Sequence, residues 1–287
     1  MRQQIKNIVL EEFNRVLLTI TKDFYKNYAK KNYNFLLNQM DKRMLANMVF
    51  VSSFESKSGF AIETCAKRIA RLKFGYENVP NLVNPRNLKH SINSNITSGQ
   101  IVITDVNNDS GALQGEIATF RANNMAHGRG KKQEPSKITQ ELLQRSLLPL
   151  SQKYKTNSIY TKPVDLAFFD GIDWNIAEIK AGGDLDSSNA PSNVEKLLNI
   201  YIDMGIPNCK AYFVALYNKN GENNTWTGAV KKHLNYPSMF LIGSNFWNKI
   251  LPVDITFYDF EQIYHDALTE LDLNQKFNQM LANVSGE

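Results

Sequence analysis

Two carboxylates and a lysine that lie close together in the chain, Asp165, Glu178 and Lys180, are the residues best suited to a chemical function. Two carboxylates that face each other repel, so the arrangement is favourable when a cation lies between them. Hard oxygen ligands on an open site favour Mg2+, which keeps several of its waters. A lysine beside that ion could hold or activate a water, or stabilise charge on a phosphate. Together these groups predict metal-assisted hydrolysis of a phosphodiester.

A β-hairpin would bring these side chains together. Apolar stretches on both sides of residues 170–173 predict two strands, and the Asp-Gly-Ile-Asp sequence between them is rich in turn residues. With the turn centred in the middle of these four residues, Asp165 faces Glu178 at a Cβ distance of roughly 5 Å. Because side chains alternate along a strand, Glu178 and Lys180 share one face.

The same residues also fit a surface hairpin with an ordinary Glu–Lys pair, because so short a pattern often arises by chance. However, apolar residues surround the three polar side chains, and charges buried among them need a partner or a ligand. The sequence Ala181-Gly182-Gly183 would also let a ligand approach the backbone just beyond Lys180. These features favour the catalytic interpretation.

The segments Pro163-Val164-Asp165 and Glu178-Ile179-Lys180 resemble the signature of the PD-(D/E)XK nucleases, with Val164 as a departure from the strict pattern. Among these nucleases the chain is most similar to type II restriction endonucleases, in particular to the TdeIII-type family, which cuts GGNCC-like sites. Three further segments carry the resemblance: Ser58-Gly59-Phe60 with Glu63, Ile179-Lys180-Ala181-Gly182, and Gly243-Ser244-Asn245-Phe246-Trp247.

The resemblance assigns roles to individual residues. Asp165 and Glu178 match the metal-binding acids, Lys180 matches the catalytic lysine, and the backbone carbonyl of Ile179 would be a further metal ligand. Glu63 matches an acidic helix position that in many such enzymes lies near the metal. An ion pair between Glu63 and Lys67, one helical turn later, fits that position equally well.

A basic segment is the predicted DNA contact. Residues 121–137 contain five Lys or Arg and one Glu, in a long irregular stretch. Glycines would let its backbone approach a groove, and an arginine could contact guanine edges. A loop that touches only phosphates, or nothing, would have the same composition. The predicted DNA-contacting residues are Arg121, His127, Arg129, Lys131 and Lys132.

The order of predicted elements favours one α/β domain over residues 1–287 with a restriction-endonuclease-like core, a mixed central sheet flanked by helices, and helical additions at both ends. Within it we expect a helical region at 1–75, inserted DNA-contacting loops at 77–135, a catalytic core at 136–260 and a C-terminal helix at 261–287. Predicted helices are 3–30, 33–48, 59–73 with Ser58 as N-cap, 135–148, a helix opened by a capping box at 192–195 that ends near 204, 245–250 and 259–282; predicted strands are 101–103, 164–169, 174–179, 210–217 and 239–242.

Composition and charge limit the alternatives. Of the 287 residues, 43% are hydrophobic and 21% charged, which fits a packed core and argues against a disordered chain. No apolar run approaches the roughly 20 residues of a membrane span, and two cysteines predict neither a disulfide framework nor a thiolate zinc site. The net charge of +5 combines −6 over residues 254–287 with +11 over the rest. A basic body fits a polyanionic partner, although a solvated basic surface explains it as well.

The sequence therefore predicts a Mg2+-dependent type II restriction endonuclease that cleaves double-stranded DNA at a short palindromic site and leaves 5′-phosphate ends. The resemblance implies a homodimer, with the N-terminal helices as candidates for the contact, and a cognate DNA methyltransferase that acts on the same site. It also implies a bacterial cytoplasmic location, with no membrane and no ATP. Alternatives are a structure-selective or repair nuclease with the same core, a DNA-binding module without catalysis, and a structural hairpin in a protein that binds another acidic partner.

Overall fold

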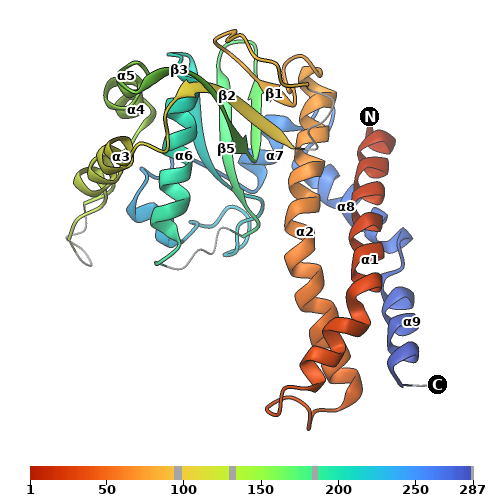
Figure 1. Ribbon diagram of the computed structural model, residues 1–287. Helices are drawn as coiled ribbons and strands as arrows, with labels where there is room; N and C mark the ends of the chain where they lie inside the picture. Colours follow the sequence, from red (N-terminus) through yellow and green to blue (C-terminus); the bar gives the residue numbers. More distant parts are fainter. Residues whose placement is uncertain (94–98, 129–133, 183–186, 286–287) are drawn as a thin grey trace. The chain divides into compact units, whose positions relative to one another are not determined.

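The computed structural model describes residues 1–93, 99–128, 134–182 and 187–285 (Figure 1). It divides into two compact units, of which the first comprises Met1–Ile69 with Leu251–Glu287 and the second Ala70–Ile250. No helix in the described part of the chain is long and apolar enough to cross a membrane.

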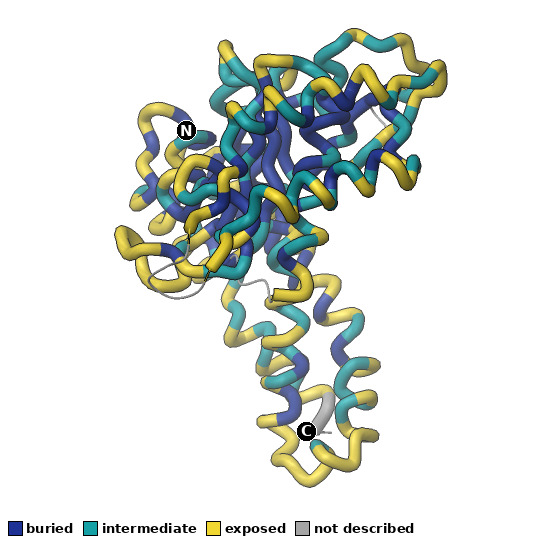
Figure 2. The backbone as a smooth tube through the Cα atoms, turned by 90° about the vertical axis from the view of Figure 1, so that its left-hand side faces the viewer, coloured by how far each residue is buried: buried dark blue, intermediate teal, exposed yellow. Residues whose placement is uncertain are grey.

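The first unit is helical. It contains α1 (Arg2–Asn32), most of α2 (Lys42–Phe74), α8 (Phe257–Glu270) and α9 (Leu273–Ser285). Apolar residues at three- and four-residue spacing on α1 are buried, as an amphipathic helix requires, and buried and exposed residues alternate along the tube in Figure 2. α1 packs against α8 and α9, and Lys6 forms an ion pair of 2.8 Å with Glu270.

Two helix boundaries in this unit differ from the prediction. The predicted helices at 33–48 and 59–73 are one helix, α2, and Ser58 is not an N-cap: its hydroxyl donates to the Glu55 carbonyl at 3.2 Å inside the helix. The predicted helix at 259–282 is divided into α8 and α9 at Asp272, which has a φ of +46°. Gly75 follows the end of α2 with a φ of +85°, a left-handed conformation that suits glycine after a helix.

The second unit contains two mixed sheets flanked by helices, which confirms the predicted fold class. One sheet has the order β1-β2-β3 and the other β4-β5-β6-β7. β1 runs parallel to β2, β3 is antiparallel to β2, and β4 is antiparallel to β5, while β5, β6 and β7 are parallel. The strands are β1 (Leu82–Val83), β2 (Gln100–Val106), β3 (Lys155–Val164), β4 (Leu166–Phe169), β5 (Trp174–Lys180), β6 (Cys209–Ala215) and β7 (Phe240–Ile242).

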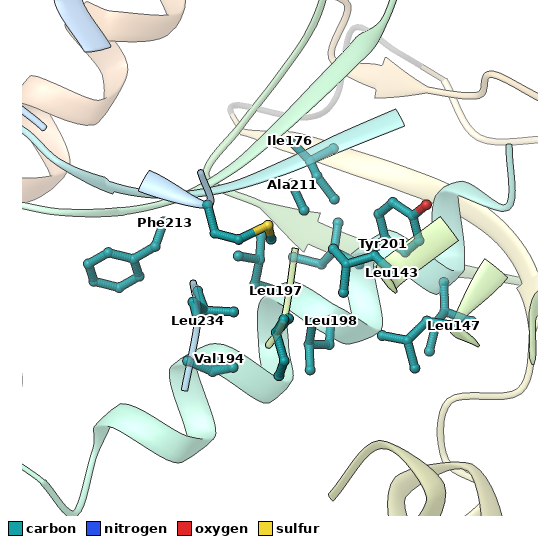
Figure 3. Packing of buried hydrophobic residues seen from close by; sticks show 14 of the residues in the cluster. Leu143, Leu147, Ile176, Val194, Leu197, Leu198, Tyr201, Ala211, Phe213 and Leu234 are labelled. Carbon is teal, nitrogen blue, oxygen red and sulfur yellow. The ribbon is translucent and has the colours of Figure 1, made fainter. Parts of the chain in front are cut away.

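The longest helix lying wholly within this unit, α6 (Ala190–Met204), connects β5 to β6 and packs against β2, β5 and β6. Figure 3 shows its buried residues, among them Val194, Leu197 and Tyr201, beside Ile176 and Phe213 of the sheet. The other helical segments of the unit are α3 (Gly111–Asn124), α4 (Gln140–Ser146), α5 (Leu148–Lys153), the 3-10 turn at Ala229–Lys232 and α7 (Ser244–Ile250).

The predicted hairpin register is confirmed. β4 and β5 pair Leu166 with Ala177 and Phe169 with Trp174. Continuing this register by one residue places Asp165 opposite Glu178, as the turn at 170–173 predicted.

Three other predictions in this unit were wrong. The region 77–135 is not only loops, because α3 occupies 111–124 and buries Leu113 and Ile117 in the core. The helix predicted from 135 begins at Gln140, where the backbone N–H of Leu142 donates to the Thr139 hydroxyl. α6 begins at Ala190, without a capping box at 192–195.

Two glutamine side chains substitute for strand backbone at the sheet edges. Gln100, which is 2% exposed, donates to the carbonyls of Pro80 and Ala167 at 2.8 Å and accepts from the Ala167 N–H at 3.0 Å. Gln140 pairs with Ala211 of β6 in the same two-bond pattern, at 2.7 and 3.1 Å. Gln100 thus ties β2 to β4 two residues beyond Asp165.

We predict that Gln100→Ala lowers the free energy of unfolding by about 2–4 kcal/mol, because it leaves buried backbone groups without partners. Gln140→Ala is expected to lower it by a similar or smaller amount. The exposed Gln152→Ala on α5 is the matched control. Urea unfolding measures all three, and a Gln100→Ala midpoint equal to that of Gln152→Ala would contradict this role of the amide.

Candidate active site

Asp165 is the single residue between β3 and β4. Its Oδ2 accepts a hydrogen bond of 2.9 Å from the backbone N–H of Ile179 on β5. The carboxylate therefore continues the β4–β5 pairing with a side chain, and this bond holds it beside the carboxyl end of β5.

Glu178 lies in the interior of β5 and is 1% exposed. Its Oε1 accepts from Lys180 Nζ at 2.7 Å. Burial, and then the negative charge of Asp165, raise the pKa of Glu178 above its ordinary value, while the neighbouring lysines oppose that rise. A buried carboxylate in this position is stabilised by any additional cation.

Lys196, which is not among the site residues predicted from the sequence, supplies such a cation. From α6, its Nζ lies 3.0 Å from Asp165 Oδ1 and 2.6 Å from Glu178 Oε2. Burial by itself would lower the pKa of Lys196, but the charges of Asp165 and Glu178 and the hydrogen bonds to them raise it above its usual value. The ammonium is thus positively charged between two carboxylates.

The connection from β5 to β6 explains how Lys196 reaches the site. These strands are parallel, so the intervening helix starts near the carboxyl end of β5, where Lys180 lies. The sequence signal that could have identified Lys196 is its place in the second turn of a helix that follows β5. The predicted capping box at 192–195 assigned a role to Glu195 instead.

The donor set of this site fits a divalent cation with oxygen preference. Oε2 of Glu178 is buried and, among the described residues, faces Lys196 Nζ at 2.6 Å. No cluster of three or more His, Cys, Asp or Glu that could hold a metal occurs in the described parts of the chain. A metal ion at the predicted ligands Asp165 and Glu178 would take its remaining ligands from the predicted Ile179 carbonyl, waters and substrate oxygens, a set that Mg2+ accepts.

The other predicted site residues have different surroundings. Glu63 lies half-buried on α2 in the first unit, and its place beside the metal stays a prediction. The space beside Gly182 is taken by the Tyr217 ring, because a Cβ at that glycine would lie 2.6 Å from the Tyr217 hydroxyl. The predicted approach of a ligand at Gly182 would therefore require Tyr217 to move.

The predicted DNA-contacting residues are partly described. Arg129, Lys131 and Lys132 lie outside the described residues. His127 is exposed, and its backbone pairs with that of Glu134 at 2.8 and 3.2 Å. His127 and Glu134 therefore lie side by side within the basic segment 121–137.

Arg121 takes part in an ion pair within the protein. Its Nε donates to Glu195 Oε1 at 2.8 Å, and Nη1 lies 3.2 Å from Nδ1 of His233. Burial, and then the charge of Arg121, lower the pKa of His233 to about 4, so this ring is neutral at pH 7 and can accept from the guanidinium. The interpretation of Glu195 as a capping residue was wrong, since its carboxylate binds Arg121.

Comparison with known proteins identifies the class as type II restriction endonucleases. A family described as "Type II restriction endonuclease, HinfI" matches residues 1–267, and the chain belongs to this family. The protein is therefore a site-specific deoxyribonuclease, and enzymes of this class generally use divalent metal ions. The predicted class is confirmed by this match to the HinfI family, while the resemblance to the PD-(D/E)XK signature and to the TdeIII-type family stays a prediction. No curated protein and no solved structure matched the chain.

We predict that Arg121 acts mainly through Glu195. Arg121→Met and Glu195→Gln should each lower the free energy of unfolding by about 1–3 kcal/mol, because each leaves a half-buried partner behind. The double variant should lose less than the sum of the two. Chemical unfolding of the four proteins measures this coupling, and the more exposed pair Lys162–Asp109 provides the control cycle.

Additive effects for Arg121 and Glu195, together with weaker DNA binding and a smaller salt dependence for Arg121→Met, would instead support the predicted DNA contact.

Proposed function

We propose that this protein cleaves double-stranded DNA at a short palindromic site in a Mg2+-dependent reaction that leaves 5′-phosphate and 3′-hydroxyl ends. The observation that carries the proposal is the pair of carboxylates at the β4–β5 hairpin. Asp165 and Glu178 come close enough to share one cation, Lys196 Nζ, at 3.0 and 2.6 Å. Family membership supplies the substrate class.

The two carboxylates have different supports. Asp165 is oriented by the Ile179 N–H, whereas Glu178 is oriented by Lys180 and by its position inside β5. When bound, Mg2+ would supply a Lewis acid and a more acidic water at this place. The hydrogen bond from the β5 backbone keeps Asp165 ready for that role without a change in the hairpin.

Lys180 is proposed to act on the scissile phosphate. It lies at the end of β5, and 29% of its side chain is exposed, so its ammonium can face both Glu178 and a bound substrate. There it would orient the attacking water and stabilise the negative charge that develops on the phosphate. The backbone carbonyl of Ile179 and the side chain of Glu63 are proposed as further contributors.

The basic segment 121–137 is proposed as a DNA contact. The backbone of His127 pairs with that of Glu134, and Arg129, Lys131 and Lys132 lie between these two residues in the sequence. We further propose a homodimer, because a palindromic site is matched by a two-fold protein, and a cognate methyltransferase that protects the same site in the bacterial cytoplasm. The recognition sequence is proposed to be GGNCC-like on the resemblance of the sequence.

Digestion of a sequenced, unmethylated phage DNA tests the function. The wild type with Mg2+ is expected to give discrete bands whose ends map to one palindrome, and EDTA is expected to abolish them. Asp165→Asn, Glu178→Gln and Lys180→Met should each reduce the rate at least about a hundredfold, because each removes a group that acts on the reacting phosphate or its metal. Lys210→Met, which removes an ion pair with Asp173 elsewhere on the sheet, is the matched control.

A smear that the active-site variants abolish would support a structure-selective or repair nuclease instead. Binding of DNA without any cleavage by folded wild-type protein would contradict the proposed catalysis.

A further inference from the structure

Lys196 occupies the place where the two carboxylates converge. Its Nζ contacts Asp165 and Glu178 at once, whereas Lys180 contacts only Glu178 among these two acids. The stem of Lys196 extends from α6, and 39% of its side chain is exposed. The ammonium is therefore held by charge more than by packing, and its long side chain has room to move.

The charges of this cluster balance in the metal-free enzyme. Asp165 and Glu178 contribute two negative charges, and Lys180 and Lys196 contribute two positive charges within 3.0 Å of them. Glu178 is 1% exposed, so water does little to screen this arrangement. A divalent cation that entered the cluster would give it two excess positive charges. One DNA phosphate removes one of these charges, and departure of the Lys196 ammonium would remove the other.

We propose that Lys196 is the resident counter-ion of the metal-free active site. It holds the two carboxylates together in the free enzyme and competes with the divalent ion for the same oxygens. Mg2+ binding to the free enzyme is therefore weak, and the negative charge of a DNA phosphate strengthens it. This inference rests on the proposed function, because it takes Asp165 and Glu178 as the metal-binding acids.

Removal of the Lys196 charge should have two opposite effects in the absence of DNA. Without the ammonium, two adjacent carboxylates at a buried position repel, so the metal-free protein loses stability. The two carboxylates, no longer neutralised by Lys196, attract a divalent ion more strongly, so the affinity for Mg2+ rises. If Lys196 served only to bind a DNA phosphate, its removal would not be expected to tighten Mg2+ binding in the absence of DNA.

The test uses full-length protein with Mg2+ alone and no DNA. Titration calorimetry measures the Kd for Mg2+, and thermal unfolding with and without Mg2+ measures stability. For Lys196→Met we expect a Kd at least tenfold lower than that of the wild type. We also expect a Tm about 3–10 °C lower without metal and a larger rise in Tm on adding Mg2+. Lys196→Arg keeps the positive charge and should bind Mg2+ no more tightly than the wild type.

Lys210→Met is the matched control, because it removes a lysine–aspartate ion pair away from the site, between Lys210 of β6 and Asp173 at 2.6 Å. The difference in Tm between Lys210→Met and the wild type should be the same with and without Mg2+. If Lys196→Met does not fold without metal, recovery of folded protein on adding Mg2+ supports the proposal. Lys196→Gln then provides the calorimetric measurement.

Two results would overturn the inference, and they differ in their meaning. If Lys196→Met binds Mg2+ no more tightly than the wild type while the wild type cleaves DNA, Lys196 is not the competing counter-ion and the proposed function stands. If neither protein binds Mg2+ and the wild type does not cleave DNA, the proposed metal site itself is wrong.

Discussion

Repulsion between two neighbouring carboxylates is the constraint on which this structure depends. Asp165 and Glu178 face each other because the hairpin register requires it, and Glu178 is buried within β5. Such a pair is stable only with compensating positive charge. Lys180 from the same strand and Lys196 from α6 supply it, so the sheet and the crossover helix must be assembled before the site exists.

Several features outside the site maintain that assembly. Gln100 joins β2 to β4 by side-chain hydrogen bonds two residues from Asp165. The apolar face of α6 packs on β5 and β6, which fixes the height of Lys196 above the strands. The residue before Lys196, Glu195, binds Arg121 in the last turn of α3. α6 therefore connects the charge cluster of Asp165 and Glu178 with the last turn of α3.

The hairpin could be predicted from the sequence because its signals are local. The alternation of side chains and the four-residue turn determine which residues face each other, and the pairs from Leu166–Ala177 to Phe169–Trp174 follow that register. Lys196 could not be predicted in the same way. Its role comes from the crossover of α6 between parallel strands, which depends on tertiary packing and not on spacing along the chain.

Other errors also have physical causes. β3 escaped prediction because most of Lys155–Val164 is polar and exposed, so no alternation of apolar side chains marks it. α3 begins with glycine and is rich in polar residues, and Leu113 and Ile117 are its fully buried residues, with Phe120 partly buried against the core. Ser58 was interpreted as a helix start because its hydroxyl suits a cap, but the flanking apolar residues continue the packing of one helix.

The location of a bound metal ion tests whether Asp165 and Glu178 bind it in place of Lys196. Crystals of the protein with a duplex carrying its site, grown with Mn2+ in place of Mg2+, would show the ion by anomalous scattering. We expect a peak coordinated by the Asp165 and Glu178 carboxylates, with Lys196 Nζ displaced from between them. A peak elsewhere, with Lys196 still bridging both acids in the DNA-bound enzyme, would contradict it.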